Sequence, residues 1–289
     1  MKLLALILLL QSTYVLSAPL ATLTKGMDRP ECALLHGKFL YVSNMSGPGN
    51  ARDNVGWINK LDRNGKMIQE KWVSSLHAPK GMKIWKDTLY VTDIDSVVSV
   101  DLKTSSVTRH PVPGAILLND IALDGEGNLY VSDTFGSKIY FVNFESGKNQ
   151  IEVFATLSDA PNGLYLEGTK LYVAGYGKSK ADGTGMEDGP KGGLSVIDVK
   201  TKEVTSLVPE LGRNDGLAML PNGQLLLTLK GEEAIHWIDV KENKIIGTLK
   251  GATSLAVLTD VADIDFDAKT KILYVPNTRT HDVQLIQLK

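Results

Sequence analysis

A sixfold internal repeat is the feature that most constrains the fold of this chain. Its copies begin with "PECALLHGKFLYVSN" at residue 30, "APKGMKIWKDTLYVTD" at 78, "LLNDIALDGEGNLYVSD" at 117, "APNGLYLEGTKLYVAG" at 160, "GRNDGLAMLPNGQLLLTL" at 212 and "DVADIDFDAKTKILYVPN" at 260. When the residue before the first glycine of each copy, or before the residue that replaces this glycine, is aligned, successive copies lie 39 to 53 residues apart. A period of this length, with several short strands in each copy, is typical of the blades of a β-propeller.

The third copy shows the expected strands most clearly. Four apolar or alternating runs, "DIAL", "NLYVSD", "KIYFVNF" and "IEVFA", are separated by "DGEGN", "TFGS" and "ESGKN". The Gly and Asn residues of these separators suit the turns of β-hairpins. Each copy therefore predicts a four-stranded antiparallel blade, and no stretch after the first residues of the chain has a convincing helical period.

The two ends of the chain predict how the ring closes. The sixth copy ends at "DVQLIQLK" after three strands, and an extended segment, "PLATLTKGM", precedes the first copy. Pairing of this segment with the last blade would protect two exposed strand edges. We therefore predict an all-β fold, a single six-bladed β-propeller over residues 19–289 whose ring is closed by an N-terminal strand joining the last blade.

Residues 1–18, "MKLLALILLLQSTYVLSA", predict a signal peptide. Lys2 precedes a short apolar run, and the small residues Ser17 and Ala18 end the segment. The run is too short to cross a bilayer, and no second apolar segment follows it. We expect cleavage, with Ser17 as the favoured last residue of the leader, and a periplasmic or secreted protein.

Composition limits the partners of the chain. The formal net charge is −2 over 289 residues, and about −3 without Lys2, with no basic run. This balance argues against nucleic acid or a membrane surface as a partner.

Cys32 is the only cysteine, so no intrachain disulfide can form; a buried apolar role is the simpler interpretation, and a free reactive thiol is the alternative. Because a closed ring has no free edge, we expect a monomer.

The residue before the first glycine of each copy, or its substitute, is the informative position. It reads Glu31, Lys80, Asn119, Asn162, Asp215 and Ala262. The innermost strands of a propeller begin on one face, so we expect these six residues, called the mouth ring below, around the mouth of the central channel. Turn propensity alone would explain Asn or Asp before Gly. It does not explain Glu31, and converging carboxylates need neutralisation, for which a bound cation would serve.

The ring offers a hard-oxygen ligand set. Two carboxylates and two amide oxygens suit calcium, which takes six to eight oxygen ligands and leaves positions for water or substrate. Neither Cys nor His enters the ring, which argues against a site specific for a transition metal. We therefore expect calcium, or another divalent cation, at Glu31, Asn119, Asn162 and Asp215.

The motifs "RPECALL", "LLND", "PNGL" and "NDGLAMLPNGQLLLT", in this order, resemble the gluconolactonase and regucalcin family of six-bladed propellers, and more distantly paraoxonase and diisopropylfluorophosphatase. The resemblance covers nearly the whole chain after the leader. It implies a divalent ion bound by Glu31, Asn119, Asn162 and Asp215. In the gluconolactonase branch the third-blade Asn lies nearer the substrate, so the resemblance leaves open whether Asn119 binds metal or substrate.

The chain departs from that family at two positions. Leu117 stands where the sugar-lactone branch typically carries Arg, and Lys80 stands where the paraoxonase branch carries His. The resemblance thus implies a hydrolase of lactones or esters less polar than sugar lactones, with Leu117 beside the substrate.

In such a hydrolase the metal would polarise the carbonyl group and hold the developing oxyanion. By similarity to proposals for the family, Asp215 would position or activate water. Lys80 would stabilise negative charge in the transition state, or it would only offset the two carboxylates as a residue of the rim.

Two long Gly-rich connections, residues 43–56 and 175–193, should rise on the same face as the ring. Such loops are substrate lids or insertions without function, and we favour lids. Asp133 and His281 lie in shorter connections on that face and are further candidates for substrate binding, as is His77.

A propeller that binds a ligand or a protein without chemistry is the main alternative, because a fold does not establish an activity. Convergence of Glu31 and Asp215 separates the two, since a binding module does not need it. A redox propeller with an organic cofactor is a third possibility, but the sequence shows no concentration of Arg or Trp at the mouth.

Overall fold

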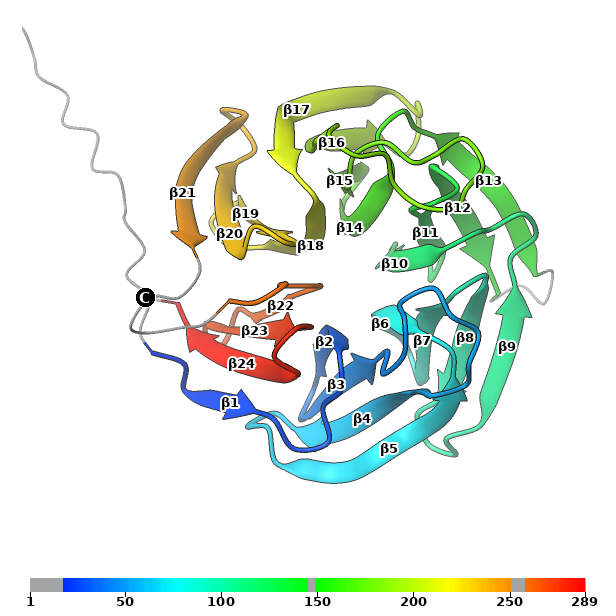
Figure 1. Cartoon of the computed structure of the whole chain (residues 1–289), viewed down its shortest axis with the longest axis vertical. Helices are drawn as coiled ribbons and strands as arrows, with labels where there is room; N and C mark the ends of the chain where they lie inside the picture. The colour runs from blue at the N-terminus through cyan, green and yellow to red at the C-terminus, as the bar shows by residue number, and fades with distance from the viewer. Residues whose placement is uncertain (1–17, 145–148, 251–257, 289) are drawn as a thin grey trace, which may run out of the picture.

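The computed structural model describes residues 18–144, 149–250 and 258–288. Six four-stranded antiparallel sheets surround a central axis like the blades of a propeller (Figure 1), which confirms the predicted fold. The predicted signal peptide lies outside the described residues except for Ala18. The described part of the chain contains no helix long and apolar enough to cross a membrane.

The blades follow one another along the chain. Blade 1 holds β2 (Pro30–His36), β3 (Phe39–Asn44), β4 (Gly56–Asp62) and β5 (Met67–Leu76). Blade 2 holds β6 (Pro79–Trp85), β7 (Thr88–Asp93), β8 (Ser96–Asp101) and β9 (Val107–Pro111). Blade 3 holds β10 (Leu118–Leu123), β11 (Leu129–Asp133), β12 (Lys138–Asn143) and β13 (Gln150–Thr156). Blade 4 holds β14 (Pro161–Glu167), β15 (Lys170–Gly175), β16 (Gly192–Asp198) and β17 (Val204–Gly212). Blade 5 holds β18 (Asn214–Met219), β19 (Gln224–Leu229), β20 (Ala234–Asp239) and β21 (Lys244–Lys250). Blade 6 holds β22 (Asp265–Asp267), β23 (Ile272–Asn277), β24 (Asp282–Gln287) and β1 (Ala21–Leu23).

The N-terminal strand closes the ring as predicted. β1 pairs antiparallel with β24, and Ala21 lies opposite Leu285. The backbone N–H of Leu20 adds a hydrogen bond of 2.7 Å to the carbonyl of Leu285. Ala21 and Leu23 also pack against the apolar layer between blades 6 and 1. The strand therefore covers the outer edge of the last blade with both hydrogen bonds and apolar contacts.

Apolar layers between neighbouring blades hold the ring together. Between blades 1 and 2, Tyr41 and Ile58 form a buried cluster with Met82 and Leu89. Cys32 belongs to the same cluster as a buried free thiol, as the simpler interpretation predicted. Because the blades are polar at their outer strands and apolar on their faces, stacking them removes the apolar faces from water.

Buried hydroxyl groups connect the inner ends of adjacent blades. Ser132 Oγ accepts a hydrogen bond from the Asp120 N–H and donates one of 2.6 Å to the carbonyl of Asn162 in the next blade. In blade 5, Thr228 Oγ1 accepts from the Gly216 N–H and donates one of 3.0 Å to the carbonyl of Ala262. These hydroxyls fix the backbone of mouth-ring residues, which explains the Ser or Thr near the end of the second strand.

Replacing Thr228 with Val keeps the volume of the side chain but leaves the Ala262 carbonyl without its buried donor. We expect a loss of about 1–3 kcal/mol in the free energy of unfolding, since an unsatisfied buried polar group costs that much. Urea unfolding followed by tryptophan fluorescence measures it. A Thr228→Val variant as stable as the parent would show that the hydroxyl contributes nothing.

Candidate functional site

Five of the six residues of the mouth ring lie in strands and not in turns, whereas Ala262 precedes β22 (Asp265–Asp267). Glu31, Lys80 and Asn162 are each the second residue of an inner strand, and Asn119 and Asp215 have the same place in β10 and β18. The pairing of each of these strands with its neighbour shifts register at this point, as in a β-bulge. Bulges redirect side chains beside active sites. Turn propensity therefore does not account for the residue types in the ring.

The glycine after the ring residue is needed for close approach of backbones. A Cβ atom on Gly163 would overlap the carbonyl oxygen of Asp215, and one on Gly216 would lie 2.5 Å from the Cα of Asp263. Neither glycine has a positive φ angle. Gly at these positions thus lets the inner strands of adjacent blades approach near the axis.

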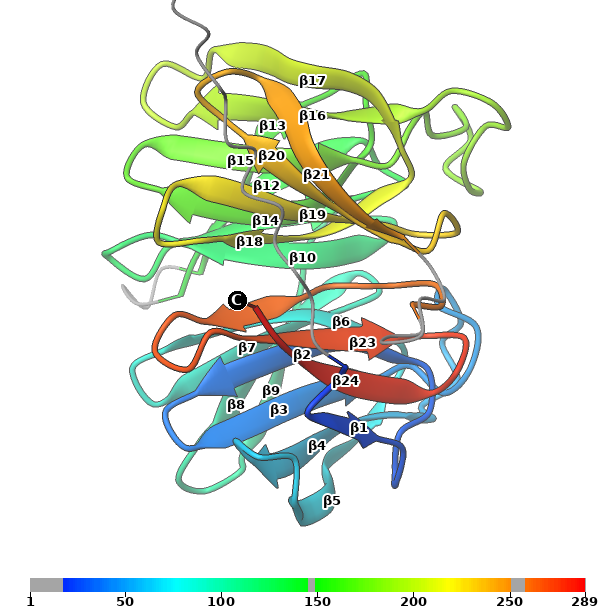
Figure 2. The same ribbon diagram turned by 90° about the vertical axis from the view of Figure 1, so that its left-hand side faces the viewer.

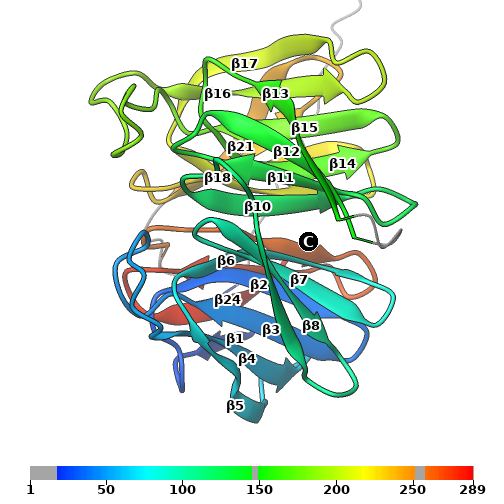
Figure 3. The ribbon, with the colours of Figure 1, turned by 90° about the vertical axis from the view of Figure 1, so that its right-hand side faces the viewer.

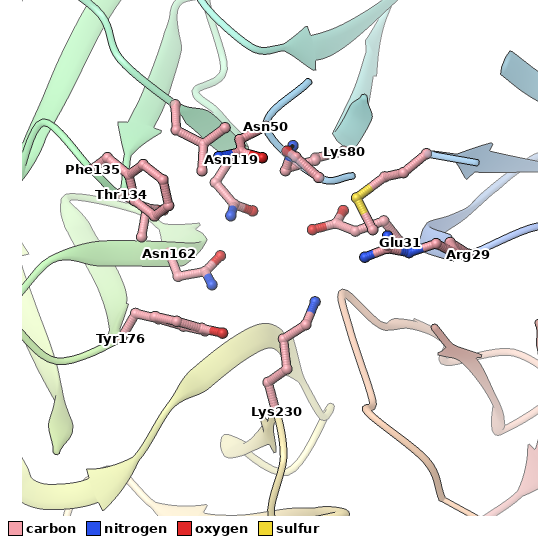
Figure 4. Close-up of a pocket in the computed structure, with 13 residues that line it drawn as sticks. Arg29, Glu31, Asn50, Lys80, Asn119, Thr134, Phe135, Asn162, Tyr176 and Lys230 are labelled. Carbon is pink, nitrogen blue, oxygen red and sulfur yellow. Dashed lines mark hydrogen bonds between the residues drawn. The ribbon is translucent and has the colours of Figure 1, made fainter. Parts of the chain in front are cut away.

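A cavity of about 280 Å³ opens at the mouth of the channel (Figure 4). Glu31, Asn162 and Lys230 point their polar ends into the same central space. Asp215 is 1% exposed and does not line the cavity, and its Oδ2 lies 3.4 Å from the Lys230 Nζ. The cavity is lined by Arg29, Glu31, Met45, Gly49, Asn50, Lys80, Leu117, Asn119, Thr134, Phe135, Asn162, Tyr176 and Lys230.

Three buried oxygen atoms of the ring have no hydrogen-bond partner among the described residues. They are Glu31 Oε2, Asn162 Oδ1 and Asp215 Oδ1, from blades 1, 4 and 5. Buried polar atoms are normally paired, so unpaired ones in or beside a cavity are candidates to bind a ligand. Within the described ranges no three His, Cys, Asp or Glu side chains are grouped to hold a metal ion. The oxygens offered here come instead from two carboxylates and an amide, which is a set that hard cations accept.

Burial and like charge oppose ionisation of the carboxylates. Burial raises the pKa of Glu31 well above its usual value, and repulsion by Asp215 adds to the rise. Burial also raises the pKa of Asp215, against the attraction of Lys230. For Lys230, burial alone would lower the pKa, but the carboxylates of Asp215 and Glu31 outweigh it and raise the pKa. Among these three groups Lys230 thus keeps its charge, whereas burial opposes ionisation of both carboxylates.

Sequence reasoning missed Lys230, although a signal for it exists. Lys230 directly follows the second strand of blade 5, and Thr134 and Tyr176 follow the second strands of blades 3 and 4. All three line the cavity, as does Met45 after the second strand of blade 1. In four of the six blades the residue after the second strand thus lines the mouth cavity. Lys230 supplies part of the positive charge that compensates the carboxylates, so their convergence alone does not require a bound cation.

Lys80 lines the cavity and is nearly buried. Its Nζ donates hydrogen bonds of 2.6 Å to the Gly49 carbonyl and 3.0 Å to the Ala78 carbonyl. An ammonium group has three donors, so one is left for a ligand. Burial lowers the pKa of Lys80 to about 8, against the attraction of Glu31 and Asp93.

Leu117 and Asn119 line the cavity, whereas Asp133 and His281 do not. Asp133 Oδ1 accepts hydrogen bonds from the N–H groups of Leu117 and Gly136, and its Oδ2 accepts one from Ile116. Its carboxylate therefore holds the connection that leads into β10, where a substrate was expected.

The two histidine candidates also have protein partners. His281 is half-exposed and its Nδ1 lies 2.7 Å from Asp28 Oδ1. His77 Nδ1 accepts a hydrogen bond of 3.3 Å from the Asn54 N–H. Neither ring lines the mouth cavity.

The two long loops project from the same face of the disc, as Figures 2 and 3 show for the β3–β4 and β15–β16 connections. From the loop at 43–56, Met45, Gly49 and Asn50 line the cavity, and the bond from Lys80 to Gly49 holds this loop over the mouth. From the loop at 175–193 only Tyr176 reaches the cavity.

Comparisons with known proteins identify the fold. No family model matches the sequence, and no curated protein matches it. Among solved structures, virginiamycin B lyase from Staphylococcus aureus is 13% identical, with 96% of this chain and 100% of that chain covered and a TM-score of 0.63. A structural genomics protein of unknown function from Bacteroides thetaiotaomicron is 11% identical, with 94% and 72% covered and a TM-score of 0.67. A chain of a nidogen/laminin complex is 15% identical, with 82% and 94% covered and a TM-score of 0.58.

These similarities define the chain as a six-bladed β-propeller of a fold that includes enzymes and binding modules. At such low identity they carry the fold alone. Membership of the gluconolactonase and regucalcin family stays a prediction from the sequence.

The close approach of the inner strands near the axis can be tested by substituting a glycine. Gly163→Ala should destabilise the protein by about 2–3 kcal/mol, because its Cβ meets backbone that cannot move aside. Gly125→Ala is the control, since a Cβ there meets nothing within 4 Å and its φ is not positive. Thermal unfolding of both variants is the measurement. Equal melting temperatures would contradict the proposed close approach.

Proposed function

We propose that the protein is an exported hydrolase of esters or lactones that holds a divalent cation at the mouth of its channel. Calcium is the first candidate for this cation. The observation that carries the proposal is the set of three unpaired buried oxygens, Glu31 Oε2, Asn162 Oδ1 and Asp215 Oδ1. A binding surface without chemistry has no need to bury two carboxylates against their own repulsion.

The charge pattern supports a cation at these atoms. Lys230 contacts Oδ2 of Asp215 and leaves Oδ1 of the same carboxylate unpaired. Glu31 and Asn162 would hold the cation with Asp215, and waters would complete six to eight oxygen ligands. Asn119 lines the same cavity, so it would contact either the ion or the substrate. When bound, the cation would polarise the carbonyl group of the substrate.

Side chains of the protein would contribute to the other parts of the hydrolysis reaction. Water adds to the carbonyl carbon, the bond to the alcohol oxygen breaks, and an ester gives an acid and an alcohol while a lactone gives a hydroxy acid. Lys80 has one free donor for the negative charge that develops on the carbonyl oxygen. Leu117 and Phe135 give the cavity an apolar wall against which a substrate can lie. Activation of water by Asp215 stays a prediction from the resemblance.

Calcium titration of the folded chain tests the ion directly. The parent should bind one calcium ion, and Glu31→Gln or Asp215→Asn should weaken binding by about tenfold or more, because each removes a charged ligand. Lys230→Met should strengthen binding by about tenfold, since it removes a neighbouring positive charge. Glu167→Gln, at the other end of β14 from Asn162, is the control.

Calorimetry measures these affinities without any assumption about activity. If the parent takes up no divalent ion and Lys230→Met does not change this, the mouth holds no metal site.

Hydrolysis is tested on aryl esters and lactones with calcium and with a chelator. We expect turnover that the chelator abolishes and that Lys80→Met lowers by about tenfold or more, as for the loss of one oxyanion donor. Deletion of residues 178–190 should change substrate preference more than stability. Calcium binding without turnover of any ester or lactone would favour the alternative, a propeller that binds a ligand or a protein.

A further inference from the structure

A second cavity, of about 270 Å³, lies beside the mouth cavity and is lined by residues of blades 4 and 5. Lys230 lines both cavities and so connects them. Lys191 and Arg213 line only the second one. Together the two spaces reach the size of small-molecule sites, about 300–1,000 Å³.

The backbone brings the two innermost cations together. Arg213 directly precedes β18 and Lys230 directly follows β19, and the Lys230 N–H donates a hydrogen bond of 2.8 Å to the carbonyl of Arg213. Both side chains therefore leave the same end of the same pair of strands.

The guanidinium group of Arg213 contacts an aromatic ring. Its Cζ lies 5.5 Å from the ring centre of Tyr176, and Tyr176 lines the mouth cavity. No carboxylate of the described residues forms an ion pair with it. Stacking on an aromatic ring holds a guanidinium in place while its N–H donors stay available for a planar oxyanion.

The charge of the second cavity is positive. Its one acidic residue, Glu232, faces Lys191 across 3.4 Å, and both side chains are about half exposed. Such a pair is weak and opens easily. The cavity is lined by three cationic side chains and one carboxylate, so its net charge favours an anion. The glycines at 189, 212 and 231 in its wall have no side chains and leave space for one.

We propose that this second cavity is a subsite for an oxyanion, a carboxylate or a phosphate, carried by the substrate. The inference rests on the proposed function, because the ester or lactone carbonyl of the same molecule would lie in the mouth cavity. Lys230 lines both cavities, so the charged group of the substrate and its reacting carbonyl group would both lie close to this residue. The substrate would thus be an anionic ester or lactone with its charge on the acyl side or the alcohol side.

Binding of simple anions tests the subsite independently of hydrolysis. Succinate and inorganic phosphate are titrated at constant ionic strength, with chloride as the reference. Arg213→Gln should weaken binding of the preferred anion by about tenfold, the size expected for a charge-assisted hydrogen bond. The loop variant Lys191→Gln should weaken it as well. Arg279→Gln, which removes an Arg paired with Glu233 outside both cavities, is the matched control. Melting temperatures verify that each variant is folded.

The anion that binds more tightly identifies the substrate group. If neither anion binds more tightly than chloride in the parent, or if Arg279→Gln weakens binding as much as Arg213→Gln, the subsite does not exist.

A pair of matched esters separates this inference from the proposed function. 4-Nitrophenyl butyrate and 4-nitrophenyl hydrogen succinate differ in whether a methyl group or a carboxylate ends the acyl chain. The succinate ester should have a kcat/KM about tenfold higher or more, and Arg213→Gln should lower that value much more than the value for butyrate. Anion binding without turnover of either ester would overturn hydrolysis alone. Equal turnover of both esters without anion binding would overturn the subsite alone.

Discussion

Crowding of the inner strands around one axis determines the rest of this structure. Gly163 and Gly216 leave room for the backbone of the next blade, and a side chain at either position would overlap it. The residue before each of these glycines lies at a bulge: Asn162 lines the mouth cavity, and Asp215 contacts Lys230, which lines it. Side chains from different blades thus meet although they are far apart in sequence. The same geometry that closes the ring concentrates carboxylates, amides and ammonium groups in one small space.

The fold could be predicted from the sequence because its signals are local and repeated. Alternating strands, hairpin turns and an incomplete last copy led to six blades and to closure by the N-terminal strand, and the sheet order β22-β23-β24-β1 confirms both. The Ser and Thr residues near the end of the second strand had no interpretation, since their partners lie in the next blade. Their role in joining blades is visible only when Ser132 is seen to contact Asn162.

The site was predictable only in part. Glu31, Asn119 and Asn162 line one cavity with Lys80 and Leu117, as the alignment of the copies suggested. Asp133 differs: it ends a strand on the mouth face, but its carboxylate accepts backbone hydrogen bonds from three residues. Lys230 was missed because the alignment of the copies followed the first strand of each blade, whereas Lys230 follows a second strand, β19. Position along a repeat indicates which face a residue occupies, whereas hydrogen bonding decides whether its side chain stays free for a ligand.

Positive charge distinguishes this mouth from a simple calcium site. Lys80, Lys230 and Arg29 line the cavity with Glu31, and Arg213 lies beside it. A cation bound by oxygens would share this space with ammonium groups, and such a mixture suits a substrate that carries negative charge or develops it during reaction. The charge pattern thus gives the site a preference that the fold alone does not.

An anomalous difference map from crystals grown with calcium would test directly whether the unpaired oxygens of three blades bind one ion. We expect a single peak at the mouth, about 2.3–2.6 Å from Glu31 Oε2, Asn162 Oδ1 and Asp215 Oδ1. A map without a peak, in which Lys230 Nζ contacts both Glu31 and Asp215, would contradict it.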